Sequence, residues 1–329
     1  MEVLDGLWNE VVGFFGVSRF FNILAAGNYQ ALLTYQGVTA LIAPIIPLLV
    51  VLELFLGRIY KKTQTKVYKI AFLIYIANRI IGRFIAIGMV ALCIGFWSAY
   101  APWQLPKTWY GFIAAYIIWE FAHYIYHFLG HKVRLFWCFH ATHHTPEDMN
   151  LSVTYAHFFL EAPYADTIRT TICILLGVDP ATLFVIMFVD GTYGAFIHVG
   201  ENLIRDARFG ILNKVMLTPS HHRVHHARNP LYIDTNYCNM LNIWDRIFGT
   251  YQEEKTNLKP EYGITRPYDS ANFWDIYFGE IITLTRDIAK APGLLNKLKY
   301  IVMPPGWSHT GDHKTAAVIK QQRMQNLQS

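Results

Sequence analysis

Long apolar runs limit what this chain can fold into. Two extend over about residues 37–56 and 70–97, and a third, 109–129, begins apolar and becomes rich in histidine. A helix of about 20 apolar residues is long enough to cross a bilayer. The whole chain is 53% hydrophobic and 16% charged, with a mean hydropathy of +0.23, which is more apolar than a typical soluble protein. The sequence therefore predicts an all-α integral membrane protein.

Two further apolar segments lie within residues 170–199 and are joined at 177–180 by the sequence GVDP, which is typical of a turn. They would either cross the bilayer in full or form a shallow hairpin. We expect one membrane domain, 1–329, with four to five apolar segments, a cytoplasmic helical cap and a loose C-terminal tail at 315–329. The N-terminus lacks the basic start of a signal peptide, so no cleaved leader is expected.

Charges beside the apolar runs predict an orientation. The connection after the first run is basic and contains Arg58, Lys61, Lys62, Lys66 and Lys69. The connection after the second run contains only Lys107. Basic loops stay on the cytoplasmic side of a membrane. This places all the histidine-rich segments on the cytoplasmic face, of either a bacterial inner membrane or the endoplasmic reticulum.

The remaining composition excludes several classes of protein. The net charge of +5 is small and dispersed, without a basic block, so nucleic-acid binding is not expected. The four cysteines are scattered, without a CxxC pair, which predicts neither a disulfide framework nor a thiolate metal site. A metal site in this chain would therefore depend on histidine.

Histidine occurs at helical spacing in three places. His123 and His127 are one turn apart, and 140–144 and 222–226 each place three histidines at i, i+3 and i+4, on one helix face. A lone histidine is usually a core or surface residue, and HHRVHH (221–226) alone could be a solvated loop. Three such clusters on one membrane face favour a metal site, and they exceed the four ligands of one zinc. Two metal ions are therefore expected.

The order of HxxxH at 123–127, HxxHH at 140–144 and HxxHH at 222–226 resembles the fatty acid hydroxylase/sterol desaturase superfamily. The resemblance covers about 109–251, the expected catalytic region, and includes FIHVGEN around His198 and NIWDRIFGTY at its end. It implies a membrane-bound, non-haem di-iron enzyme that uses O₂. HHTPEDMNLS and TPSHHRVHHARN are similar to the alkylglycerol monooxygenase branch, which implies oxidation of ether lipids with a tetrahydropterin as reductant.

Nine histidines are the predicted metal ligands: His123, His127, His140, His143, His144, His198, His222, His225 and His226. Each ligand ring needs an acceptor at its second nitrogen. The residues that could hold a ring, or act as a further ligand, are His131, His157, His221, Glu120, Glu147, Asp148, Asn150, Glu201, Asn202 and Asn236. Of these, His131 continues the i, i+4 series from His127, either as a tenth ligand or as a helix cap.

The placement of the site predicts its partners. An amphiphilic lipid would enter from the bilayer, while O₂ and the reductant arrive from water. The chain has no haem-binding, flavin or nicotinamide motif, so we expect a separate electron donor.

The sequence leaves two alternative functions open. A sterol or fatty-acyl desaturase would use the same metal centre. A zinc-dependent membrane hydrolase or a metal carrier would use histidine without redox chemistry. The chain lacks the HExxH of a zinc protease, and its clusters do not line a path across the bilayer.

Overall fold

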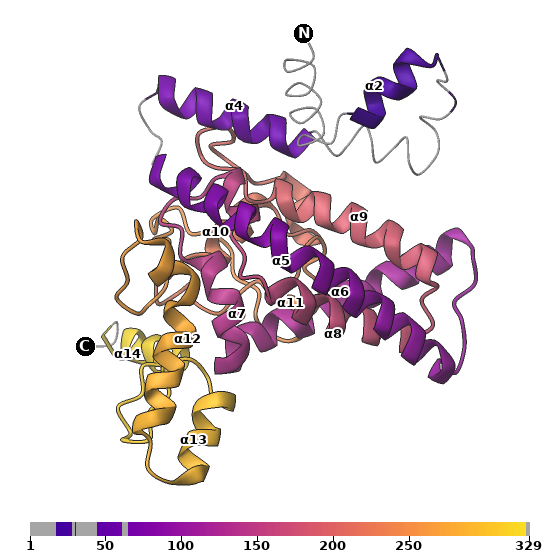
Figure 1. The fold of residues 1–329 in the computed structure, drawn as a ribbon. Helices are drawn as coiled ribbons and strands as arrows, with labels where there is room; N and C mark the ends of the chain where they lie inside the picture. Colours follow the sequence, from indigo (N-terminus) through magenta and orange to yellow (C-terminus); the bar gives the residue numbers. More distant parts are fainter. Residues whose placement is uncertain (1–17, 28–29, 31–44, 61–64, 327–329) are drawn as a thin grey trace.

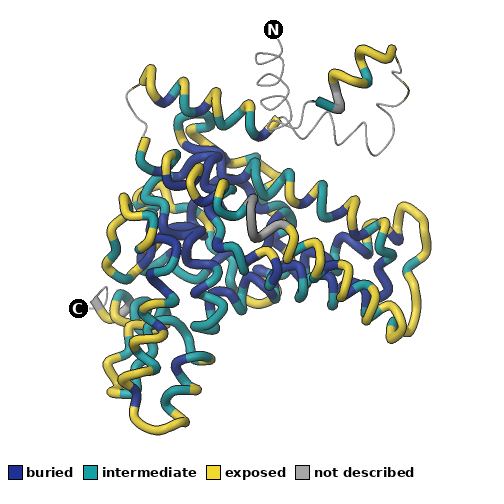
Figure 2. Tube along the Cα trace, in the orientation of Figure 1, coloured by how far each residue is buried: buried dark blue, intermediate teal, exposed yellow. Residues whose placement is uncertain are grey.

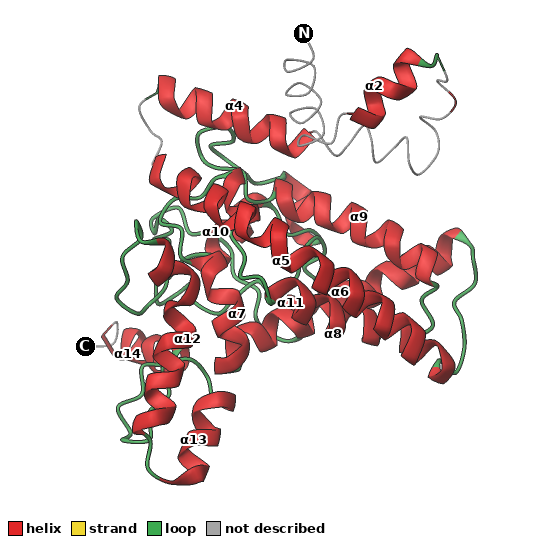
Figure 3. Ribbon diagram, in the orientation of Figure 1, coloured by secondary structure: helices red, strands yellow, loops and turns green. Residues whose placement is uncertain are grey.

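The computed structural model describes residues 18–27, 30, 45–60 and 65–326. The described residues form helices joined by loops, and they contain isolated β-bridges but no strand (Figure 3). The prediction of an all-α protein is confirmed for this part of the chain. The helices are α2 (Ser18–Ala25), α4 (Ile45–Ile59), α5 (Thr65–Trp97), α6 (Trp109–Lys132), α7 (Arg134–His144), α8 (Glu161–Leu175), α9 (Pro180–Phe196), α10 (Pro219–His225), α11 (Ile243–Ile247), α12 (Phe273–Lys290), α13 (Gly293–Val302) and α14 (Ala316–Asn326). Short 3₁₀ helices are η2 (Ser98–Tyr100), η3 (Leu151–Tyr155) and η4 (Gly210–Lys214).

The long helices α5, α6, α8 and α9 lie side by side (Figure 1). Their shared core includes the fully buried side chains of Trp119, Leu183 and Ile186. The helices α10 to α14 gather at one end of this bundle, where α7 also lies. The histidine-rich segments meet at that junction.

The predicted turn at 177–180 is confirmed. Helix α8 ends at Leu175, and α9 begins at Pro180, a residue suited to the first turn of a helix. The Asp179 side chain caps α9 by accepting hydrogen bonds from the Ala181 and Thr182 amides at 3.0 and 3.3 Å. Gly177 has a φ of +82°, which a residue with a Cβ rarely adopts. The two segments therefore form an antiparallel helical hairpin.

None of the helices in the described ranges is both long enough and apolar enough to cross a bilayer. The first predicted apolar run, 37–56, lies partly outside the described residues, and α4 begins only at Ile45. Figure 2 shows exposed positions along the outer side of α4. The exposed large apolar side chains of α4 and α5 include Leu48, Phe55, Phe84 and Leu92.

The C-terminal segment differs from the prediction. Residues 315–329 were expected to be a loose tail, but 316–326 form α14. Val318 and Ile319 on α14 are half-buried and line a cavity beside the histidines.

A buried arginine fastens α10 to the loop that follows His198. Arg223 is 1% exposed, and its guanidinium donates hydrogen bonds to the carbonyl oxygens of Val199, Ile204 and Arg205 at 3.2, 2.6 and 3.2 Å. Val199 is 2% exposed, so its carbonyl has little access to water and depends on this donor. Arg223 thereby fixes the histidines of α10 relative to His198.

Replacing Arg223 with Met should lower the free energy of unfolding by about 2–4 kcal/mol, because buried carbonyl groups lose their donor. Denaturant unfolding of the full chain, in one detergent, measures this difference. The matched control is Arg208→Met at an exposed site, where we expect a change of no more than about 0.5 kcal/mol. Equal losses in the two variants would contradict the role assigned to Arg223.

Candidate metal centre

Nine histidines converge in two adjacent groups. The first histidine group contains His127, His131, His140, His144 and His225. The second histidine group contains His143, His198, His222 and His226. Within each group, one ring nitrogen from every member lies within 4.8 Å of those of all the others, and all nine residues are buried. The segment 222–226 therefore meets the segment 140–144, although about 80 residues separate them.

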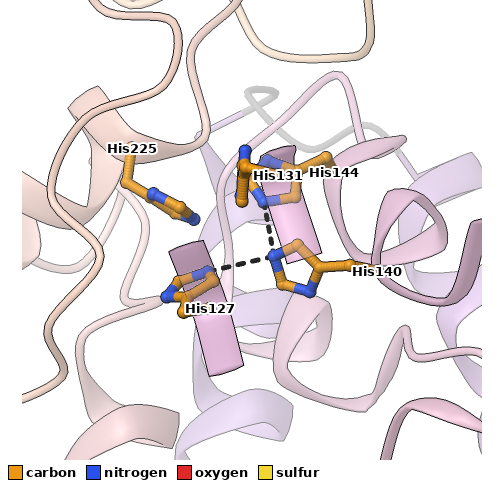
Figure 4. Close-up of side chains that lie close together, drawn as sticks. All are labelled: His127, His131, His140, His144 and His225. Carbon is orange, nitrogen blue, oxygen red and sulfur yellow. Dashed lines mark hydrogen bonds between the residues drawn. The ribbon is translucent and has the colours of Figure 1, made fainter. Parts of the chain in front are cut away.

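Three helices and one turn supply the rings. Helix α6 carries two members of the first group, and its C-terminal cap Val133 is extended, so the chain turns before α7 begins. Figure 4 shows the first-group rings pointing toward one another. On α7, His140 and His144 join the first group and His143 joins the second; on α10 and its cap, His225 joins the first group and His222 and His226 the second.

The rings that link the two groups are in contact. His144 of the first group stacks on His226 of the second, with ring centroids 4.4 Å apart and an interplanar angle of 23°. Helices α7 and α10 each carry rings of both groups. The spacing of residues along a helix therefore fixes the distance between the two groups.

The hydrogen bonds of the first group show which ring nitrogens carry lone pairs. His127 Nδ1 lies 2.8 Å from the carbonyl oxygen of Tyr237, and His140 Nδ1 lies 2.6 Å from Glu161 Oε1. A carbonyl or carboxylate oxygen accepts, so both Nδ1 atoms donate, and in a neutral ring the Nε2 atom then has a lone pair. Those two Nε2 atoms are only 3.0 Å apart. Two facing lone pairs repel, so this arrangement is favourable when a cation lies between them.

The same reasoning applies elsewhere in the two groups. His225 Nδ1 donates to the carbonyl oxygen of Thr235 at 2.8 Å, and its buried Nε2 has no hydrogen-bond partner among the described residues. His198 Nδ1 donates to the carbonyl oxygen of Gly194 at 2.6 Å. The Nε2 atom of His198 then faces those of His143 and His222 at 3.1 and 2.9 Å. These donor sets fit two metal ions, one for each group.

Burial keeps the rings neutral. Desolvation, and then the neighbouring imidazoles, lower the pKa well below the usual 6.5 for His143, His144, His222, His225 and His226. Burial also lowers the pKa of His198 to about 3. Neutral imidazole is the form that binds a metal, so no proton has to leave these rings at neutral pH.

A loop at 234–242 holds several of the ligand rings. It provides the carbonyl groups that bind His127 and His225, and Asp234 Oδ1 lies 3.3 Å from His131 Nδ1. Two buried carboxylates fix the loop through its amides: Asp245 accepts from residues 237 and 238, and Glu120 accepts from residues 239–241. The two acids thus hold the backbone of this loop in place. The carbonyl groups of the loop in turn orient the ligand rings.

Eight of the nine predicted ligands lie in the two groups, together with His131. His123 does not lie in either group: its Nδ1 is 3.7 Å from Asp190 Oδ2, so its metal role stays a prediction. His157 stacks on His143 at 4.2 Å and contacts Glu161 Oε2 at 2.8 Å.

His221 also lies outside both groups. Its Nδ1 accepts a hydrogen bond from the Thr218 amide at 3.1 Å and so completes a capping box at the start of α10. Its Nε2 lies 2.8 Å from the Tyr251 hydroxyl. Adjacent residues point to different faces of a helix, which separates His221 from His222.

The predicted ring-holding residues contact other groups. Glu147 forms an ion pair with Lys66 at 2.8 Å, the Asn150 side chain accepts from the Ser152 amide, and Asn236 donates to the carbonyl groups of residues 221 and 252. Glu120 binds backbone amides. Asp148 and Asn202 are half-buried, and Glu201 is exposed. Nearness in sequence was a poor guide here, because side chains next to a ligand point away from its ring.

Sequence reasoning missed Glu161, which bridges two imidazoles. Its Oε1 accepts from His140 and its Oε2 from His157, and it is 2% exposed. The one available signal was its i, i+4 spacing from His157. Asp234 was missed as well, because it lies in a loop 90 residues beyond the last ligand of α7.

Replacing Glu161 with Gln should weaken metal binding by about 10-fold to 100-fold, because the anchor of His140 loses its charge. Competition with a chromogenic chelator measures the affinity. Glu147→Gln is the control, since Glu147 pairs with Lys66 and does not contact a ligand ring. An equal loss in both variants would contradict the anchoring role.

The metal-free protein should lose stability in acid. The unfolded histidines take up protons near pH 6.5, whereas the folded rings, with their lowered pKa, do not. The stability is therefore complete above about pH 6.5 and falls below it, by about 1 kcal/mol or more per pH unit. Urea unfolding at pH 7.5 and 5.5 tests this, and an unchanged midpoint would be inconsistent with buried neutral rings.

Comparisons with known proteins address the same region. Residues 112–250 match the family model described as fatty acid hydroxylase. A human alkylglycerol monooxygenase is 36% identical over 208 residues, which are 63% of this chain and 44% of that protein. A Xenopus tropicalis alkylglycerol monooxygenase is 33% identical over 222 residues, 66% of this chain and 47% of that protein. An ornithine lipid hydroxylase of Rhizobium tropici is 30% identical over 172 residues, 52% and 50% of the two chains.

The chain spans about half the length of these curated relatives. No solved structure gives a significant match. All nine residues of the two histidine groups lie inside the matched region. Residues 112–250 thus match the fatty acid hydroxylase family, and the chain is similar to the alkylglycerol monooxygenases.

Proposed function

We propose that this chain is an O₂-dependent lipid monooxygenase with two iron ions, one in each histidine group. The observation that carries the proposal is the convergence of buried imidazoles whose ring nitrogens face one another in two adjacent groups. The relatives support the reaction class, because they are named as monooxygenases and a lipid hydroxylase.

Iron suits this donor set and this reaction. Imidazole binds several divalent metals, but zinc has no redox states. Two bound irons would supply the electron transfer that reduces O₂ and allows attack on an unactivated C–H bond. The protein residues hold the ligand rings in one tautomer through carbonyl and carboxylate acceptors. Burial of the rings keeps bulk water away from the reacting groups.

The proposed substrate is an amphiphilic lipid. The resemblance to the alkylglycerol monooxygenase branch suggests an ether lipid, with oxidation next to the ether oxygen, and the Rhizobium relative is named for an ornithine lipid. A tetrahydropterin is the proposed reductant, on the same resemblance. It would come from outside the chain, since the sequence contains no haem, flavin or nicotinamide motif.

We place the protein at a membrane, with the histidine groups on the cytoplasmic side. The support is the sequence charge asymmetry and the exposed apolar side chains of α4 and α5, such as Phe55 at 61% and Phe84 at 77% exposure. Large exposed apolar surfaces mark contacts with lipid or with other proteins. A lipid contact would bring the substrate to α4 and α5, and α5 packs in the bundle that includes α6.

Reconstituting the full chain with iron tests this function. We expect about two irons per chain and transfer of ¹⁸O from ¹⁸O₂ into a monoalkylglycerol when a tetrahydropterin is present. His225→Ala and His143→Ala should each remove about one iron and lower turnover at least 100-fold, because each removes a ligand from one group. His309→Ala is the control, since His309 lies outside both groups and contacts the Tyr300 hydroxyl.

Other outcomes separate the alternatives. Zinc in place of iron, with no oxygen consumption, would overturn the oxygenase proposal and favour the zinc-dependent hydrolase. Oxygen consumption that yields a double bond and no ¹⁸O in the lipid would favour the desaturase.

A further inference from the structure

A large cavity lies beside the first histidine group. Its volume is about 1090 Å³, and its lining includes His131, His144 and His225. The other walls come from α7, α12 and the segment 304–322, which includes α14. The cavity thus connects the metal ligands with the C-terminal part of the chain. Figure 1 shows α12 to α14 on the opposite side of the molecule from α4.

Most acidic side chains around the cavity are already neutralised. Asp234 forms an ion pair with Lys132, and its Oδ1 lies 3.3 Å from His131 Nδ1. Glu280 pairs with Arg134 at 3.3 Å and with Arg266 at 2.8 Å. Asp287 lies 4.0 Å from Arg134. These pairs form the wall of the cavity and leave little net charge on it.

Two cations of the lining remain unpaired. Arg228 and Lys314 are both exposed, and neither has a carboxylate within ion-pair distance in the part of the chain that the structure describes. Of the lining acids, only Asp312 lacks a cationic partner in that part, and its carboxylate accepts from the Thr310 hydroxyl at 3.3 Å. The lining contains four cationic and four acidic side chains, so its formal charge is zero, and among the groups without an ion pair two are cations and one is an acid.

A third group favours a polar ligand deeper in the cavity. Arg134 Nε is buried and has no hydrogen-bond partner among the described residues, although the terminal nitrogen of the same guanidinium pairs with Glu280. A buried donor without an acceptor costs stability. A ligand oxygen in the cavity could accept from it.

We propose that this cavity binds the anionic headgroup of the lipid substrate, a phosphate or carboxylate, through Arg228 and Lys314. The inference rests on the proposed function and narrows its substrate to a negatively charged amphiphile. Arg228 follows His226 by only two residues. A headgroup held there would leave the adjoining alkyl carbon close to the first histidine group, and the volume exceeds what a free phosphate ion needs.

Lipid binding by the full, metal-loaded chain in detergent tests the headgroup assignment without turnover. The probes are a monoalkylglycerol phosphate, the neutral monoalkylglycerol with the same chain, and inorganic phosphate. We expect the anionic lipid to bind at least tenfold more tightly than the neutral one. Arg228→Glu and Lys314→Glu should each reduce this preference at least threefold and leave neutral-lipid affinity within twofold.

Lys214→Glu is the matched control, because Lys214 is an exposed cation that does not line the cavity. It should leave the preference unchanged. A preference that survives both charge reversals, or is absent from the wild type, overturns the inference. Inorganic phosphate that displaces the lipid at equal concentration would show a free-anion site and would also overturn it.

The binding measurement distinguishes failure of the headgroup inference from failure of the proposed function. Lipid binding is read without O₂ or reductant, so a chain with zinc and no oxygenase activity could still show the headgroup preference. Conversely, an active di-iron oxygenase that binds neutral and anionic lipids equally would refute only the headgroup site.

Discussion

The arrangement of this protein depends on facing nitrogen lone pairs in a buried space. His127 and His140 each donate a hydrogen bond through Nδ1 to an oxygen atom of the protein. Their Nε2 atoms, 3.0 Å apart, therefore face each other with lone pairs and without a proton between them. Such a contact is repulsive between neutral rings and becomes favourable around a cation. Burial lowers the pKa of His127 well below its usual value, so a metal ion satisfies this contact better than a proton does.

Helical periodicity divides one cluster of histidines between two groups. At i and i+4 two rings stand above one another, whereas the ring at i+3 is rotated away from the first. His140 and His144 therefore reach one group while His143 reaches the other, and α10 repeats this with His225 against His222 and His226. Two adjacent centres follow from the HxxHH spacing once α7 and α10 meet.

The supporting residues show why sequence distance fails as a guide to the site. Glu120 is three residues from His123, yet its carboxylate binds the amides of residues 239–241 and so supports the loop that holds His127. Glu161 was not predicted at all, although it contacts His140 directly. A carboxylate reaches a ring only if the fold aims it there, and that direction depends on contacts between distant elements.

The sequence by itself determined the helical class, the turn at 177–180 and eight of the histidines that gather in the two groups, because these follow from local periodicity, from Gly and Pro geometry and from ligand spacing. Only the tertiary structure decided that His131 joins the first group and that His123 lies beside Asp190. It also decided which oxygens hold each ring, and that a cavity whose lining includes Arg228 and Lys314 lies beside the ligands. Apart from the local contacts of His198 with Gly194 and of His225 with Thr235, these features join residues about 20 to more than 100 positions apart, and local patterns carry no information on how such segments pack.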